Sequence, residues 1–313
     1  MIGNILVVVL PVFLIAGAGY LATRLKVFPI ASVDGLMAYA LRFAVPCLLF
    51  RAIATVDLGE VFDPGLLISF YTGAVVAFAL GILGARTIFH RRPGEAVAVG
   101  FGALFSNSAL LGLPIMERAY GTDSLAPNFA IISIHAPFCY LLGITVMEFA
   151  RADGRGFAQT GVAVMQAMFR NALMIGLAIG FVVNLGHIQL HETIWTAVDM
   201  LANSALPAAL FGLGGILTRY QLKSSVGESA MIAGLSIIVH PAISWALGSM
   251  VFDLSEPFMR SLVVTAAMAP GVNSYVFAMQ YARGQAQAAG AVLLGTAVSV
   301  VTASAWIYVL GGI

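Results

Sequence analysis

Apolar runs of about 20 residues follow one another along almost the whole chain and are separated by short polar breaks. A run of that length crosses a hydrocarbon layer roughly 30 Å thick as an α-helix. The pattern therefore predicts an all-α integral membrane protein with ten transmembrane helices and loops too short to form a soluble domain. The predicted spans lie near residues 4–23, 32–53, 65–89, 95–119, 126–150, 163–185, 192–217, 227–251, 257–281 and 286–311.

The positions of Lys and Arg predict how the spans are oriented. Eleven of the 15 basic residues fall in one set of alternate loops and helix ends, three fall in the other set, and Arg42 lies inside a span. Cytoplasmic loops carry the excess of basic residues. The chain is therefore expected to be a multi-pass protein with both termini outside.

The longest polar linker divides the chain into two halves of five spans each. We expect a first repeat over residues 1–150, a cytoplasmic linker over 151–162 and a second repeat over 163–313. An odd number of spans per half gives the halves opposite orientations. Weak similarity supports this, because Pro46–Phe50 matches Pro207–Phe211, and Asn107–Ser108 matches Asn273–Ser274. Two inverted five-helix repeats are typical of secondary carriers.

Composition narrows the function classes. Of the 313 residues, 60% are hydrophobic and 9% are charged, whereas a soluble domain has about 25% charged residues. The net charge of +1 gives no sign of a nucleic-acid partner. Cys47 and Cys139 both lie inside apolar runs, so neither a disulfide framework nor a metal cluster is expected, and no cofactor motif is present.

Two spans carry Pro, Gly, Asn and Ser near their middles, and these residues predict interrupted helices. Proline removes a helical hydrogen bond, and freed backbone groups survive within a bilayer only where they are buried or line a wet cavity. The N-termini of half-helices carry partial positive charge and unpaired N–H groups, which suits a carboxylate. The alternative is that the prolines only shape packing. The candidate binding residues are Asn107, Ser108 and Pro114 in the fourth span and Pro270, Asn273 and Ser274 in the ninth.

Arg42 is a further candidate because a cation inside a span is costly and needs a partner or a task. It could face a substrate carboxylate, pair with Asp199, or reach the interface or backbone carbonyls. At the offset between the halves it corresponds to Asn203. The side chains of Arg42 and Asn203 would then point from the two halves of the chain toward a common binding centre.

Two intramembrane histidines and Asp199 are candidates for proton coupling. His135 precedes Pro137 by two residues, and His240 directly precedes Pro241. Histidine titrates near neutral pH, but each ring could instead bind the carbonyl freed by its neighbouring proline. No acidic residue lies in the middle of either interrupted span, which disfavours sodium coupling because hard cations prefer carboxylate ligands.

Four segments in order resemble the auxin efflux carrier family, the bacterial relatives of the plant PIN proteins, within the bile-acid-transporter-like superfamily. These segments are 44–50, 107–114, 206–214 and 269–281, and the resemblance covers nearly the whole length.

The resemblance implies a scaffold domain from helices 1, 2, 6 and 7 and a transport domain from helices 3–5 and 8–10, with elevator-like motion. Helices 4 and 9 would cross at their breaks, and the substrate would bind at this crossover. Asn107, Pro114, Pro270 and Asn273 carry over as crossover residues. Bacterial members resemble carriers of malonate, malate or other small carboxylates, whereas auxin belongs to the plant branch. The expected location is the bacterial inner membrane. The expected partners are a small carboxylate substrate and membrane lipid. Whether the protein forms a homodimer is left open.

Other classes of membrane protein fit the sequence less well. A channel usually shows a repeated filter sequence or rings of charge, and neither is present. Nucleotide-phosphate loops, zinc-protease motifs and serine–histidine arrangements are also missing from the sequence, so an enzyme is not expected. A secondary active transporter of a small organic anion is the interpretation, with an ion channel or membrane sensor as the alternative.

Overall fold

The computed structural model of the chain describes residues 2–151, 172–220 and 225–311. These residues form helices joined by turns, and the one bridge between extended segments pairs Ser106 with Pro270. The prediction of an all-α protein is confirmed. Within the described residues, six helical stretches are long and apolar enough to cross a membrane: Ile30–Thr55, Pro64–Thr87, Thr122–Ala150, Glu192–Leu217, Val226–Met250 and Gln285–Val309.

The four other predicted spans coincide with the first helix, two interrupted helices and one shorter helix. Residues 4–23 lie in α1 (Ile2–Arg24). Residues 95–119 cover most of α6 (Pro93–Leu104) and α7 (Leu113–Tyr120), and 257–281 cover α14 (Glu256–Ala266) and α15 (Val272–Gln280). Of 163–185, the described part contains α10 (Ala172–Leu185).

Three helices contain a widened π-helical turn, and each has the same cause. These turns span Ala40–Ala44, Ser108–Gly112 and Leu235–Val239, each two residues before a proline: Pro46, Pro114 and Pro241. A proline ring clashes with the carbonyl four residues earlier, and in all three cases that carbonyl belongs to the widened turn. The extra residue per turn relieves the clash without ending the helix.

The described residues divide into two compact units, and each unit takes helices from both halves of the sequence. The large unit contains residues 2–10, 63–151, 220 and 225–311, and the small unit contains 11–62 and 172–219. This membership follows the two helix sets that the family resemblance implies, except that residues 2–10 of the first helix fall in the large unit. The division into inverted repeats at 150 and 163 stays a prediction, and the proposed linker lies outside the described residues beyond Arg151.

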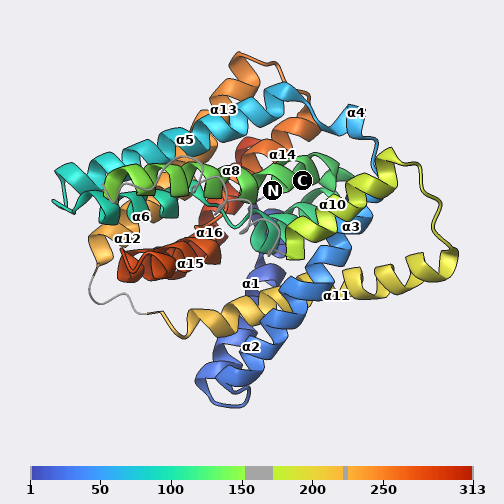
Figure 1. Cartoon of the computed structure of the whole chain (residues 1–313), viewed down its shortest axis with the longest axis horizontal. Coiled ribbons are helices and arrows are strands. Elements are labelled where there is room, and N and C mark those ends of the chain that lie inside the picture. The colour runs from blue at the N-terminus through green and yellow to red at the C-terminus, as the bar shows by residue number, and fades with distance from the viewer. Residues whose placement is uncertain (1, 152–171, 221–224, 312–313) are drawn as a thin grey trace. The chain divides into compact units, whose positions relative to one another are not determined.

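In the small unit, α2 (Ile30–Tyr39), the first π-helical turn and α3 (Val45–Thr55) run end to end as one rod (Figure 1). The helices α10 and α11 (Glu192–Leu217) pack against α3. The amide of Asn184 on α10 donates hydrogen bonds to the carbonyls of Ile53, at 2.9 Å, and Val56, at 2.8 Å. It thereby satisfies the end of α3, where helical carbonyls lack partners.

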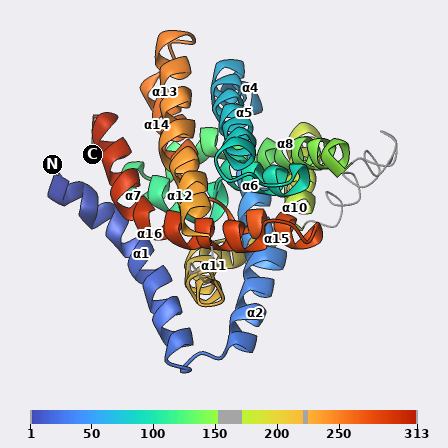
Figure 2. The same cartoon turned by 90° about the vertical axis from the view of Figure 1, so that its left-hand side faces the viewer.

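In the large unit, α5 (Pro64–Thr87) packs against α6 and against α13 (His240–Met250). Its start follows from sequence, because the Asp63 side chain accepts the Leu66 N–H at 2.8 Å and Pro64 occupies the first turn. Figure 2 shows α13 beside α14, in agreement with their contacts.

Four further helices complete the large unit. The helix α8 (Ala126–Arg151) packs on α6, and both α12 (Val226–Gly234) and α15 pack on α16 (Gln285–Val309). One core cluster is built largely from alanines, namely Ala77, Ala85, Ala96, Ala103 and Ala291. Small residues allow the close helix approach that drives association within membranes.

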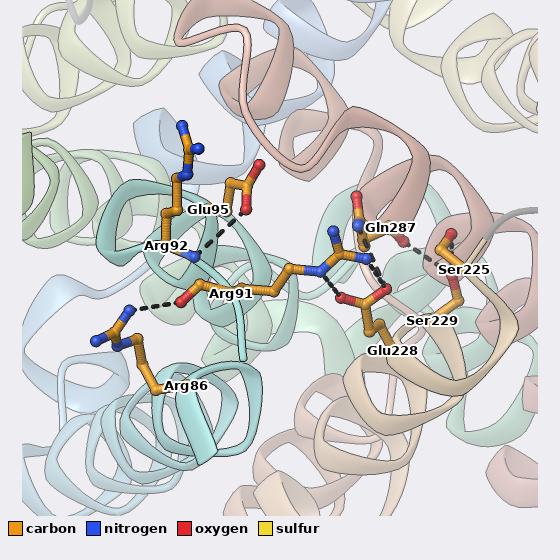
Figure 3. A network of polar contacts seen from close by, with 8 residues as sticks. All are labelled: Arg86, Arg91, Arg92, Glu95, Ser225, Glu228, Ser229 and Gln287. Carbon is orange, nitrogen blue, oxygen red and sulfur yellow. Dashed lines mark hydrogen bonds and ion pairs between the residues drawn. The ribbon is translucent and has the colours of Figure 1, made fainter. Parts of the chain in front are cut away.

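A polar network ties three segments of the large unit together (Figure 3). Arg91, in the turn after α5, forms a two-pronged ion pair with Glu228 on α12, with N–O distances of 2.5 and 2.8 Å. Glu228 is buried and also accepts a hydrogen bond from Gln287 on α16 at 3.3 Å. The hydrogen bond to Glu228 raises the pKa of the Arg91 guanidinium, so Arg91 stays protonated.

We expect the Arg91→Ala substitution to lower the free energy of unfolding by about 3 kcal/mol. This is the lower end of the cost of breaking a buried pair, because Glu228 is left buried while Arg91 is partly exposed. Thermal unfolding of the purified variant measures the loss. The control is Arg86→Ala, which removes an exposed donor to the Arg91 carbonyl and should cost about 1 kcal/mol or less. Equal losses in the two variants would show that the pair does not hold these helices.

Candidate functional site

Two helices of the large unit are interrupted at the places that the sequence indicates. After α6 ends at Leu104, residues 105–107 leave the helix, and the chain resumes in the π-helical turn that leads into α7. After α14 ends at Ala266, the chain is non-helical until α15 begins at Val272. Asn107 and Pro270 lie in these two interruptions.

The two interruptions pair with each other as a minimal antiparallel bridge. The Asn107 N–H donates to the Ala269 carbonyl at 2.8 Å, and the Gly271 N–H donates to the Phe105 carbonyl at 2.7 Å. Pro270 lies between the two bonds, so its missing N–H leaves no gap in the pairing. Each interruption thus supplies partners for backbone groups that the other sets free, which would otherwise cost several kcal/mol each in an apolar interior.

Neighbouring helices support the bridge from several sides. The Ser236 hydroxyl on the π-helical turn before α13 donates to the Met268 carbonyl at 2.9 Å. The His135 ring on α8 hydrogen-bonds to the backbone of Ser106. On α16, Gly295 leaves room for Pro270, since a Cβ at residue 295 would lie 2.6 Å from the proline Cδ. The backbone at the crossing is therefore held in one arrangement.

The side chains at the crossing are not all satisfied by the protein. Asn107 is 5% exposed and Ser274 is 0% exposed, yet the Asn107 Nδ2 and Ser274 Oγ atoms have no hydrogen-bond partner among the described residues. Thr296 Oγ1 on α16 is a third such atom. Ser106 and Ser108 bond each other, Oγ to Oγ, at 2.8 Å. Because buried polar atoms normally have partners, these leftover donors make the crossing the candidate binding site.

Comparison with known families decides the class of this protein. A profile described as membrane transport protein matches residues 4–307. The chain belongs to this family of transporters. It is therefore a multi-pass membrane transporter of the auxin efflux carrier family and not an enzyme, as the sequence predicted.

Two named relatives of this transporter span much of its length. A Rhizobium meliloti (strain 1021) protein named malonate transporter is 23% identical over 96% of this chain and 94% of its own length. Auxin efflux carrier component 5 of Arabidopsis thaliana is 25% identical over 62% of this chain and 64% of its own length.

The transporter brings some of the predicted site residues together and separates others. Ser108 and Asn107 lie at one interruption and Pro270 at the other, while Asn273 and Ser274 occupy the first turn of α15. Pro114 is in the first turn of α7 and is buried. Arg42 and Asn203 belong to the small unit, and both side chains are exposed.

One of the alternative partners considered for Arg42 is excluded. Asp199 does not pair with Arg42 but with Arg51, whose Nε lies 2.8 Å from the Asp199 Oδ1. Both partners lie in the small unit, on α3 and α11. Arg51 lies nine residues after Arg42, which is two and a half helical turns, and sequence alone did not favour this arginine over Arg42.

The expected partners of the two histidines are also wrong. The carbonyl that Pro241 frees belongs to Ile237, and it accepts a hydrogen bond from Trp306 Nε1 at 3.1 Å. His240 Nε2 instead donates to the Phe70 carbonyl on α5 at 3.0 Å. His135 binds the Ser106 backbone, and its Nδ1 also lies 3.7 Å from the Cys139 Sγ on its own helix.

The transporter's supporting residues were not predicted. Ser236, Gly295 and Thr296 lie in apolar runs where isolated small residues are ordinary. Thr296 and Gly295 fall beside the crossing only because α16 packs along α15 and α14. Finding them would have required knowing which helices pack against the two interrupted segments.

Proposed function

We propose that this transporter carries a small organic anion, and that a carboxylate of the solute binds at the crossing of the two interrupted segments. The observation that carries the proposal is the set of buried, unpartnered donors there, Asn107 Nδ2 and Ser274 Oγ. Both are neutral hydrogen-bond donors, Asn107 in the non-helical interruption after α6 and Ser274 in the first turn of α15. The start of α15 adds the partial positive charge of a helix N-terminus.

The substrate class follows from this chemistry and from the relative named malonate transporter. A mono- or dicarboxylate such as malonate or malate, or an auxin-like acid, offers the acceptor oxygens that these donors lack. Asn273 lies in the same first turn of α15 and is half-buried. Its amide is the next group in reach of a bound anion.

Alternating access is the mechanism that we propose for moving the anion. The crossing lies wholly inside the large unit, so a rigid movement of that unit would carry the site and its contents together. The small unit would serve as the scaffold. The same proposal includes ten crossings with both termini outside, in a bacterial inner membrane, since basic residues gather on one side.

We expect Asn107→Ala and Ser274→Ala each to weaken malonate transport about tenfold or more while the protein stays folded. A hydrogen bond to a charged group is worth about 1.5–3 kcal/mol, and 1.4 kcal/mol is a factor of ten. Uptake into proteoliposomes, with malate and indole acetate tested in parallel, measures the loss.

The matched control is Ser304→Ala, because the Ser304 hydroxyl only bonds the Val300 carbonyl of its own helix at 2.8 Å. Its uptake should equal that of the unchanged protein. Unchanged uptake in both crossing variants would refute the site.

We also propose that the two buried histidines take up the proton that drives transport. The Phe70 ring lies 5.6 Å from His135 and 4.7 Å from His240, centroid to centroid, and His135 reaches the crossing. With Nε2 donating to Phe70, the Nδ1 of His240 is buried and unpartnered. A proton added there places positive charge near the anion site. Asp199, paired with Arg51 in the small unit, is the weaker candidate.

This coupling predicts that malonate uptake rises as the pH falls, and that His240→Gln flattens the profile. Glutamine can still donate to the Phe70 carbonyl but does not titrate. The neighbouring Tyr71 and Cys139 ionise at higher pH in model compounds and should not contribute. His187→Asn, at an exposed position, is the control. A His240→Gln profile that follows that of the control would exclude His240 from coupling.

A further inference from the structure

A second candidate site lies in the small unit. A pocket of about 360 Å³ is lined by residues of the first π-helical turn, α3 and α10, and by none of the crossing. This volume falls within the range of small-molecule sites. The lining residues are Arg42, Phe43, Pro46, Cys47, Phe50, Ala172, Ile175, Gly176 and Ile179.

The lining has one charge and is otherwise almost wholly apolar. Arg42, Pro46 and Phe50 are spaced four residues apart, so they follow one face of the α2–α3 rod over about 12 Å. Arg42 is at one end of this row, and Ile175 and Ile179 of α10 form the facing wall. A ligand that fills the pocket therefore has one anionic end and an apolar body.

Arg42 has no ion pair or side-chain hydrogen bond within the described part of the chain, unlike two other arginines of the small unit. Arg51 pairs with Asp199 at 2.8 Å, and Arg219 pairs with Asp34 at 2.6 Å. Arginine stays charged at any physiological pH. A cation inside a span needs a counter-charge, and none is supplied here by the described residues.

The position of Arg42 along its membrane span restricts which anions could bind it. It lies near the middle of the 26-residue span Ile30–Thr55, roughly 18 Å from either end at 1.5 Å per residue. A phospholipid headgroup stays at the bilayer surface and does not reach this depth. A small dicarboxylate would place its second carboxylate against the apolar wall, where nothing pairs with it.

We propose that this pocket binds an amphipathic monocarboxylate, such as a medium-chain fatty acid, with its carboxylate on Arg42 and its chain along Pro46, Phe50 and Ile179. The site is separate from the crossing and does not depend on the function proposed for it.

Trp195 provides a native reporter of the pocket. Its ring stacks on Phe50 at 5.7 Å between centroids, with an angle of 18° between the planes. Quenching of its fluorescence by 8-bromooctanoate, measured on the full chain in nanodiscs, should saturate and should be lost in Trp195→Phe. Unlabelled octanoate should displace the probe from the unchanged protein, whereas octanol and malonate should not.

Substitutions of Arg42 test whether its positive charge binds the carboxylate of the ligand. Arg42→Gln should weaken 8-bromooctanoate binding tenfold or more, Arg42→Lys should stay within about threefold, and Arg219→Gln, which removes a remote paired arginine, should have no effect. Asn107→Ala should also leave quenching unchanged, which separates this pocket from the crossing. Quenching that never saturates, equal binding to Arg42→Gln and the unchanged protein, or displacement by octanol as readily as by octanoate would overturn the proposal.

Discussion

Backbone hydrogen bonding at the centre of a membrane-spanning unit is the constraint on which this structure depends. The helix α6 stops at Leu104, α14 stops ahead of Pro270 and Gly271, and the freed amides and carbonyls have no water to bind. The chain resolves this by pairing Phe105–Asn107 with Ala269–Gly271. Pro270 is tolerated because the pairing uses its neighbours, and Gly295 leaves it room. Once the backbone is satisfied in this way, the polar side chains beside it are left free for a solute.

Each of the two units is held together by its own polar contacts between helices. In the large unit, the Arg91–Glu228 pair and Gln287 join the turn after α5 to α12 and α16. In the small unit, Asn184 caps α3 from α10. Both devices link helices from different halves of the sequence. The alternating access that we propose requires rigid units, because the site would move as a whole.

Sequence reasoning located the helices well and their long-range partners poorly. Hydropathy placed every described span within a few residues, and Pro, Gly and Asn marked both interruptions, since these signals are local. Asn107 and Ser274 could be selected, but their lack of partners could not be known. The Arg51–Asp199 pair and the Phe70 partner of His240 depend on which helices meet. Several arginines and carbonyls were equally plausible partners until the packing was known.

The central claim is that the crossing in the large unit grips an anion through Asn107 and Ser274. Anomalous scattering from crystals of the full chain soaked with bromomalonate tests it most directly. The account predicts an ordered bromine peak beside these two side chains, and loss of that peak in Asn107→Ala crystals. Peaks confined to the Arg42 pocket, or no ordered peak at saturating ligand, would contradict it.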